Sequence, residues 1–203
     1  MSIGSYSELK TAVANWLKRS DLAAYTGDLI TFGEARIYRD LRIRAMETAL
    51  SCAISGGALS VPAGYVELKL AYIYASSVFW LQRKTAYWMY QNYPTRSSDS
   101  SPKFIAREGE NFIFGPYPDS GYTVKGIYYK KLDALSDSNT TNWFTSNAPD
   151  LLLFAALCEA EPFLKNDQRV QLWESKYAAV KDAVQRRDDQ EEFSGSILSV
   201  SAA

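Results

Sequence analysis

The stretch FIAREGENFIFGPYPDSGYTVKGIYYKKL, residues 104–132, decides the fold of this chain. It consists of short apolar runs that fit three strands. The pairs Glu108-Gly109, Gly115-Pro116 and Ser120-Gly121 separate the runs, and such pairs are typical of turns. The stretch therefore predicts an antiparallel meander in the second half of the chain.

The residues before this meander also contain strand patterns. Residues 66–74 alternate in polarity, which predicts a strand with one buried face. Short apolar pieces around Gly56-Gly57 predict a hairpin. Residues 76–94 predict a helix rich in aromatic side chains that ends at Pro94. The middle of the chain is thus expected to be mostly β.

Helical patterns flank this β-rich middle. Residues 7–19 place apolar side chains on one helical face, behind Ser5 or Ser7 as the N-cap. Thr31 and Glu34 have the spacing of a capping box, which predicts a second helix from there to about Leu50.

Two more helices are predicted near the C-terminus. Pro149 and Asp150 suit the first turn of a helix that ends or kinks at Pro162. Asn166-Asp167 can cap a final helix. That helix carries an apolar stripe, predicted to pack against the first two helices, at Val170, Trp173, Tyr177, Val180 and Val184.

The predicted fold class is α+β, mainly α. Helices from both ends of the chain, residues 1–50 and 148–192, form a bundle, and residues 51–147 form an antiparallel β-rich insertion with a short helix. Residues 193–203 carry no charge and alternate apolar residues with serine. This pattern favours an extended arm that adds to another chain's sheet edge or groove.

Composition argues against an enzyme. The chain has no histidine, which removes most triad, zinc and proton-shuttle mechanisms. No phosphate-binding, dinucleotide-binding or nucleophile-elbow motif occurs, and no pair of carboxylates is marked out for glycosidase chemistry. Cys52 and Cys158 are far apart and fit two isolated thiols. We expect no cofactor and no metal site.

No membrane segment is expected either. The apolar run that ends at Cys158 falls well short of the roughly 20 residues that cross a bilayer.

Four arginines crowd the segment ARIYRDLRIR, residues 35–44, of a chain whose net charge is only -1. They could bind nucleic acid or phosphate, or they could form ion pairs. Glu34, Asp40 and Glu47 reduce the net charge of the segment, and Asp40 with Arg44 has the spacing of a favourable helical pair. Mixed signs favour ion pairs within the chain or between subunits, although some of the four could face DNA. The candidates are Arg36, Arg39, Arg42 and Arg44.

A mixture of aromatic and basic residues allows a second interpretation, a single-stranded nucleic-acid-binding module in which bases stack on exposed rings. The alternative is that these aromatic side chains lie in a core or an interface. A pI of about 5.6 argues against nucleic-acid binding by the whole chain. The residues concerned are Tyr87, Trp88, Tyr90, Tyr93, Tyr128, Tyr129, Lys130 and Lys131.

The order of several segments resembles the head-to-tail connector adaptors of tailed bacteriophages, a family that includes head completion and tail tubular A proteins. The segments are YSELKTAVANWLKRSDL, FGEARIYRDLRIRAME, VPAGYVELKLAYI, the strand-rich stretch from Phe104 to Phe144, and APDLLLFAALCEAEPFLKND. Each is a general pattern by itself, but together they cover almost the whole chain.

The resemblance implies a structural virion protein without catalytic activity. Such adaptors form a ring, usually of twelve copies, beneath the portal. The ring extends the DNA channel without sequence-specific binding and provides the platform for the next tail or nozzle protein. In this family the C-terminal arm typically reaches into the portal. Carried over to this chain, that role would fall to Phe193, Ile197, Leu198 and Val200.

Overall fold

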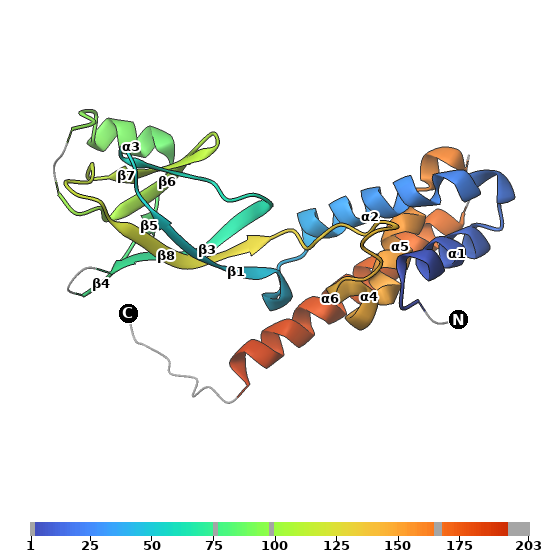
Figure 1. Cartoon of the computed structure of the whole chain (residues 1–203). Helices are drawn as coiled ribbons and strands as arrows, with labels where there is room; N and C mark the ends of the chain where they lie inside the picture. The colour runs from blue at the N-terminus through green and yellow to red at the C-terminus, as the bar shows by residue number, and fades with distance from the viewer. Residues whose placement is uncertain (1–2, 75–76, 98–99, 165–167, 195–203) are drawn as a thin grey trace. The chain divides into compact units, whose positions relative to one another are not determined.

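The computed structural model describes residues 3–74, 77–97, 100–164 and 168–194 of the chain (Figure 1). The chain divides into two compact units. A helical unit comprises Met1–Ala45 and Leu132–Ala203, and a β unit comprises Met46–Lys131. The fold class is α+β, mainly α, as predicted.

The boundaries of the two units differ from the predicted ones at residues 50 and 147. The second helix ends earlier than expected, and the loop that follows the β unit is bound to the helical unit through Leu135.

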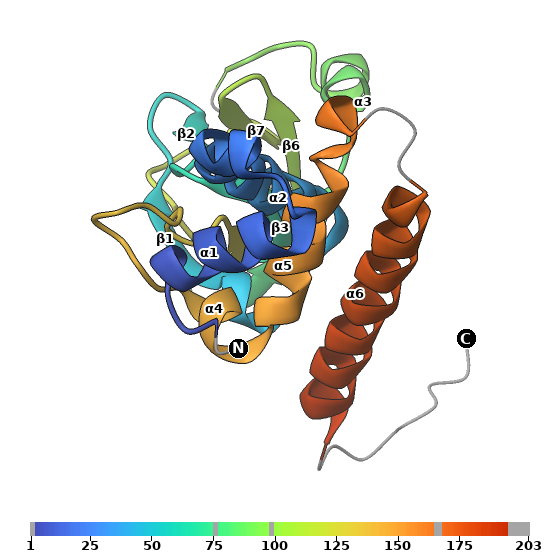
Figure 2. The same ribbon diagram turned by 90° about the vertical axis from the view of Figure 1, so that its right-hand side faces the viewer.

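Four helices form most of the helical unit. They are α1 (Tyr6–Leu17), α2 (Thr26–Asp40), α5 (Pro149–Cys158) and α6 (Arg169–Phe193), with the short helix α4 (Trp143–Asn147) and the 3-10 turns η1 (Ser20–Tyr25) and η3 (Glu161–Phe163). Nearly every side chain of α5 is buried, because α1, α2, α4 and α6 all pack against it. In Figure 2, α5 lies between α1 and α6.

The closest approach between helices occurs at Gly33 in α2. A Cβ atom at this position would lie 2.8 Å from the backbone nitrogen of Ala156 in α5. Only a residue without a Cβ allows the two backbones to come so close, so Gly33 sets the spacing of α2 and α5.

Several helix signals are confirmed. Ser5 caps α1, with its side chain accepting from the backbone N–H of Glu8. Pro149 lies in the first turn of α5 and Pro162 lies in η3 beyond its end. Of the stripe on α6, Trp173 and Tyr177 are buried, but the predicted packing partner is wrong, since α6 packs chiefly on α5 and not on the first two helices. The predicted cap Asn166-Asp167 lies outside the described residues.

The predicted capping box and the predicted length of the second helix are wrong. The helix begins at Thr26, and the hydroxyl of Thr31 donates to Gly27 within it. It ends at Asp40, because Leu41 takes an extended conformation. Residues that were assigned to its second half form η2 (Arg44–Met46) and β1 (Glu47–Ala53), where long-range strand pairing overrides the helical pattern.

The β unit contains two four-stranded sheets. The first has the order β1-β8-β3-β4, with β8 (Thr123–Lys130), β3 (Tyr65–Tyr74) and β4 (Val78–Trp80). The second has the order β2-β7-β6-β5, with β2 (Ala58–Ser60), β7 (Asn111–Gly115), β6 (Phe104–Glu108) and β5 (Gln82–Arg83). All pairs are antiparallel except β5 with β6.

One hydrophobic cluster joins the two sheets, with members such as Leu68 and Val124 from the first sheet and Ile105 and Phe112 from the second. The outer face of the second sheet is covered by α3 (Ala86–Asn92), whose Met89 packs on Ala106 and Ile113. Strand alternation explains this arrangement, because neighbouring residues of β6 and β7 point to opposite faces.

The predictions for the β unit are partly confirmed. Strand β3 and the β6–β7 hairpin form as expected. Strand β8 does not continue the meander, since it pairs with β1 and β3 in the other sheet. The turn at Gly56-Gly57 connects strands of different sheets. The helix predicted over residues 76–94 is limited to α3, and β4 and β5 precede it.

Candidate functional site

The arginine-rich segment lies where α2 ends and the chain leaves the helical unit. Arg36, in the middle of α2, lies with its Nε 3.4 Å from Glu159 Oε1 and donates from Nη2 to Glu174 Oε1 at 2.9 Å. Its guanidinium also stacks over the ring of Tyr177, 5.1 Å from the ring centroid. Arg36 therefore connects α2 to the end of α5 and to α6 within one chain.

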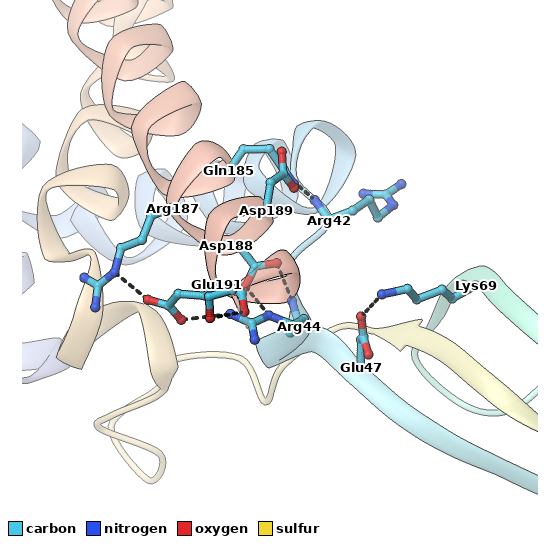
Figure 3. Close-up of polar contacts among 10 residues, drawn as sticks. Arg42, Arg44, Glu47, Lys69, Gln185, Arg187, Asp188, Asp189 and Glu191 are labelled. Atoms are coloured by element: carbon cyan, nitrogen blue, oxygen red, sulfur yellow. Dashed lines mark hydrogen bonds and ion pairs between the residues drawn. The ribbon is translucent and has the colours of Figure 1, made fainter. Parts of the chain in front are cut away.

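Arg42 closes the C-terminal end of α2. Its Nη1 donates to the carbonyl oxygens of Tyr38 and Leu41 at 2.8 and 2.7 Å. Its backbone nitrogen donates to Gln185 Oε1 of α6 at 3.4 Å (Figure 3). A positive charge at this position is favourable because the C-terminal end of a helix carries partial negative charge. Arg42 thus explains why the helix stops near this residue.

Arg44 binds two acids near the end of α6. Its backbone nitrogen and its Nε donate to Asp188 at 3.0 and 3.1 Å, and its Nη2 donates to Glu191 at 2.8 Å. Figure 3 shows these three bonds side by side. The side chain of Asp188 is only 15% exposed. Arg44 consequently fixes the last part of α6 to the segment that leaves α2.

The predicted pair between Asp40 and Arg44 is wrong. Asp40 instead accepts from the hydroxyl of Tyr177 at 2.9 Å. The pair required both residues to lie on one helix, whereas α2 ends at Asp40.

Arg39 differs from the other three arginines. It is exposed on α2, and it makes no ion pair with the residues that the structure describes. Three of the four arginines therefore hold α2 and α6 together inside one chain. A role for any of them in contacts between subunits or with DNA stays a prediction.

Replacing Arg44 by methionine should destabilise the helical unit, because the largely buried Asp188 would keep only the backbone N–H of residue 44 as a donor and lose the guanidinium. Urea unfolding followed by circular dichroism measures the change. Arg187→Met is the matched control, since that side chain is 77% exposed and pairs with Glu191 one turn away. The control should cost less than about 0.5 kcal/mol. Equal losses in the two variants would contradict the role assigned to Arg44.

Glu34 is a buried carboxylate within α2, whereas the sequence predicted it to cap the start of a helix. Only 3% of it is exposed. Both of its oxygens lie 3.3 Å from the backbone nitrogen of Leu135, and Asn142 Nδ2 donates to Oε1 at 3.2 Å. Burial raises the pKa of Glu34 to about 7, and the two donors partly offset this effect. Glu34 thereby holds the loop that returns from the β unit.

A signal for this burial was present in the sequence. Ile30 and Ile37 lie one turn before and one turn after Glu34 on the same helical face, and both are buried. A carboxylate within an apolar stripe indicates a buried charge that needs partners. The capping box of this unit lies elsewhere, at Asn142 and Thr145 at the start of α4.

The order of elements and the described contacts can now be compared with known proteins. A family model described as SU10 adaptor protein matches residues 5–199. The chain belongs to this family of phage head-to-tail adaptors. The resemblance seen in the sequence is thus confirmed at the level of the family. No curated protein matches the chain.

The candidate portal-docking residues of the adaptor lie at its C-terminal end. Phe193 is the last residue of α6 and is 60% exposed, so the helix extends one residue further than predicted. Ile197, Leu198 and Val200 lie outside the described residues. The arm therefore follows directly on the part of α6 that Arg44 holds in place.

The aromatic and basic residues of the β unit do not form one stacking surface. Tyr128 is buried in the core between the sheets, where it stacks on Tyr65. Tyr87 and Tyr90 are exposed on α3, which covers the outer face of the other sheet. Tyr128 is thus unavailable to a base, and the single-strand-binding interpretation loses part of its platform.

The adaptor belongs to a structural family, and its described residues offer few groups for chemistry. No cluster of three or more potential metal ligands occurs among them. Cys52 and Cys158 are free thiols, of which Cys158 is buried and Cys52 half-buried. No helix in the described ranges is long and apolar enough to cross a membrane.

Proposed function

We propose that this adaptor forms a ring of twelve copies beneath the portal, the copy number that its sequence resemblance implies, and that the ring extends the DNA channel and receives the next tail or nozzle protein. The family match over residues 5–199 carries the proposal, because it spans both units and most of the C-terminal arm. DNA passes through such a ring without sequence-specific contacts, and the mature protein resides in the neck of the virion.

The contacts of α6 support a docking role for the arm. Arg44 holds Asp188 and Glu191, so the helix is anchored to within two residues of its end at Phe193. An arm that starts from a fixed helix loses less conformational freedom on binding than one that starts from a mobile segment. The uncharged alternation after Phe193 suits addition to a strand edge or an apolar groove of the portal.

The proposal is tested by co-sedimentation of the purified adaptor with portal rings of its own phage. The full-length chain should bind in ring stoichiometry, and a truncation after Glu192 should bind at least about tenfold more weakly, which corresponds to about 1.4 kcal/mol. The loss is expected because the truncation removes every apolar residue of the proposed arm.

Two full-length variants separate the chemistry of the arm from its length. Replacement of Ile197, Leu198 and Val200 by serine should reproduce the loss. Replacement of Ser196, Ser199 and Ser201 by alanine should leave binding intact. If the full-length chain fails to bind intact portal rings, the proposed function is wrong. If the truncation binds as well as the full-length chain, the arm is not the docking element.

A further inference from the structure

A groove runs along one side of α6, between this helix and the start of α5. Its volume is about 400 Å³. The floor is apolar and made of small side chains, Ala148, Ala179, Val180, Ala183 and Val184. Lys176 and Asp150 stand among the polar residues at its rim. An apolar floor within a polar rim is the usual anatomy of a protein-binding surface.

The groove lies on the side of α6 that is turned away from α2. At 3.6 residues per turn, the residues of α6 that contact α2 and the segment after it lie to one side of the buried Trp173. They are Tyr177, Gln185 and Asp188. The groove residues lie to its other side and are Lys176, Ala179, Ala183 and Arg187. The contacts that hold the helical unit together therefore leave the groove open.

A patch of aromatic side chains lies elsewhere on the same unit, on η1, α2 and η3. Tyr25, Phe32 and Phe163 are 47%, 56% and 42% exposed. Phe32 lies in α2, and Tyr25 is the last residue of η1, directly before this helix begins. Phe163 stacks on Tyr25 with ring centroids 5.6 Å apart. We call these three residues the aromatic patch.

Charged residues accompany both surfaces and have opposite signs. Asp28 and Arg39 are exposed on the same face of α2 as the aromatic patch, Asp28 at its beginning and Arg39 at its end. Because α5 runs antiparallel to α6, Lys176 lies toward the start of the groove on α6 and Asp150 lies further along it. Along α2 the acidic Asp28 comes before the basic Arg39, whereas along the groove the basic Lys176 comes before the acidic Asp150. The two orders place opposite charges against each other.

We propose that the aromatic patch of one copy occupies the groove of the next copy. Phe32 enters between Ala179 and Ala183, Asp28 pairs with Lys176, and Arg39 pairs with Asp150. Patch and groove are different surfaces that share no residue, so the contact is head-to-tail and closes a ring when its rotation divides a full turn. The inference rests on the proposed ring and assigns its subunit interface.

The pairing also accounts for the two otherwise unexplained features of α2. Three exposed aromatic side chains on one unit form an apolar area that solvent does not favour. Arg39, which makes no ion pair with the residues that the structure describes, lies on the same face of α2 as Phe32. A neighbouring copy would bury the aromatic side chains and give Arg39 a partner.

Engineered cysteines test the pairing, in a background where Cys52 is replaced by serine. Asp28→Cys together with Lys176→Cys in one chain should give a ladder of covalent oligomers with a short bismaleimide, both in concentrated solution and on portal rings. The two single variants mixed together should give dimers only, since each has one reactive surface. Asp28→Cys with Ser175→Cys is the matched control, because Ser175 lies outside the groove lining, and it should give no ladder.

Charge reversal gives a second measurement that does not depend on cross-linking geometry. Asp28→Lys alone and Lys176→Asp alone should each weaken self-association at least about fivefold. The two changes in one chain should restore it, because they recreate the opposite charges across the contact.

The outcomes separate this inference from the proposed function. If portal binding in ring stoichiometry occurs without the ladder, the pairing is wrong and the ring stands. If the ladder forms without portal binding, the pairing holds and the portal docking is wrong. If neither occurs, both are wrong.

Discussion

Gly33→Val should destabilise the helical unit by about 3 kcal/mol or more, the largest loss of stability that we expect from a single substitution at a buried position. The new Cβ would lie 2.8 Å from the backbone nitrogen of Ala156 and 3.1 Å from the carbonyl carbon of Ala155. Both atoms belong to the backbone of α5, which cannot move aside as a flexible side chain can. The two helices must separate, and the packing around the buried helix α5 is lost.

Urea unfolding of the variant measures this effect, and Thr31→Val provides its control. Thr31 lies on the same helix but is exposed, so valine there should cost only the exposed hydrogen bond from the hydroxyl to the carbonyl oxygen of Gly27, about 1 kcal/mol or less. Gly33→Ala sharpens the test. Helix propensity alone predicts that alanine stabilises α2 by about 1 kcal/mol, whereas the contact with α5 predicts a loss. A gain in stability for Gly33→Ala would show that α2 and α5 do not approach as closely as described.

The sequence predicted those elements whose pattern is local. The cap at Ser5, the first-turn proline at Pro149 and the alternation in β3 lie within the elements that they define. The hairpin between β6 and β7 follows from a turn pair at Glu108-Gly109. Each of these signals acts over a few residues, so no distant partner had to be known.

The end of α2 shows what local pattern could not supply. Residues 41–50 retain helical spacing, yet β1 forms there because its seven residues pair with β8, almost eighty residues later in the chain. The same limit applies to β8, which follows the β6–β7 hairpin in sequence but joins the other sheet. A strand that can pair in either sheet is assigned by the packing of the whole unit.

The sequence predicted which residues form the candidate site, but it did not predict which side chains contact each other. Mixed charges near Arg44 indicated ion pairs, but the partner chosen on the same helix, Asp40, was wrong. The true partners, Asp188 and Glu191, come from a charged segment near the other end of the chain. Sequence spacing identifies i to i+4 partners, whereas contacts between helices need the packing angle and register of the two helices.

Glu34→Gln should change how the stability of the helical unit depends on pH. Burial raises the pKa of Glu34 from its ordinary value of 4.5 to about 7 in the folded chain. Below pH 4.5 the carboxyl is protonated in both the folded and the unfolded chain, and its contribution to stability is fully present. As the pH rises to about 7, the unfolded chain releases this proton first, so the contribution is lost. Glutamine has no such proton and can still accept from Leu135 and Asn142.

The free energy of unfolding of wild type minus that of Glu34→Gln should therefore fall by about 2–3 kcal/mol between about pH 5 and about pH 8, at about 1.4 kcal/mol for each unit of pKa shift. Urea unfolding at several pH values gives this difference directly, and effects of other titrating groups cancel in it. Glu34→Leu is the control, because it leaves the buried N–H of Leu135 without an acceptor. That variant should be about 1–3 kcal/mol less stable than Glu34→Gln at every pH, because neither variant titrates at this position. Parallel curves for wild type and Glu34→Gln would mean that Glu34 titrates alike in the folded and unfolded chain. The loop after the β unit would then be held by contacts other than a buried, largely protonated carboxyl.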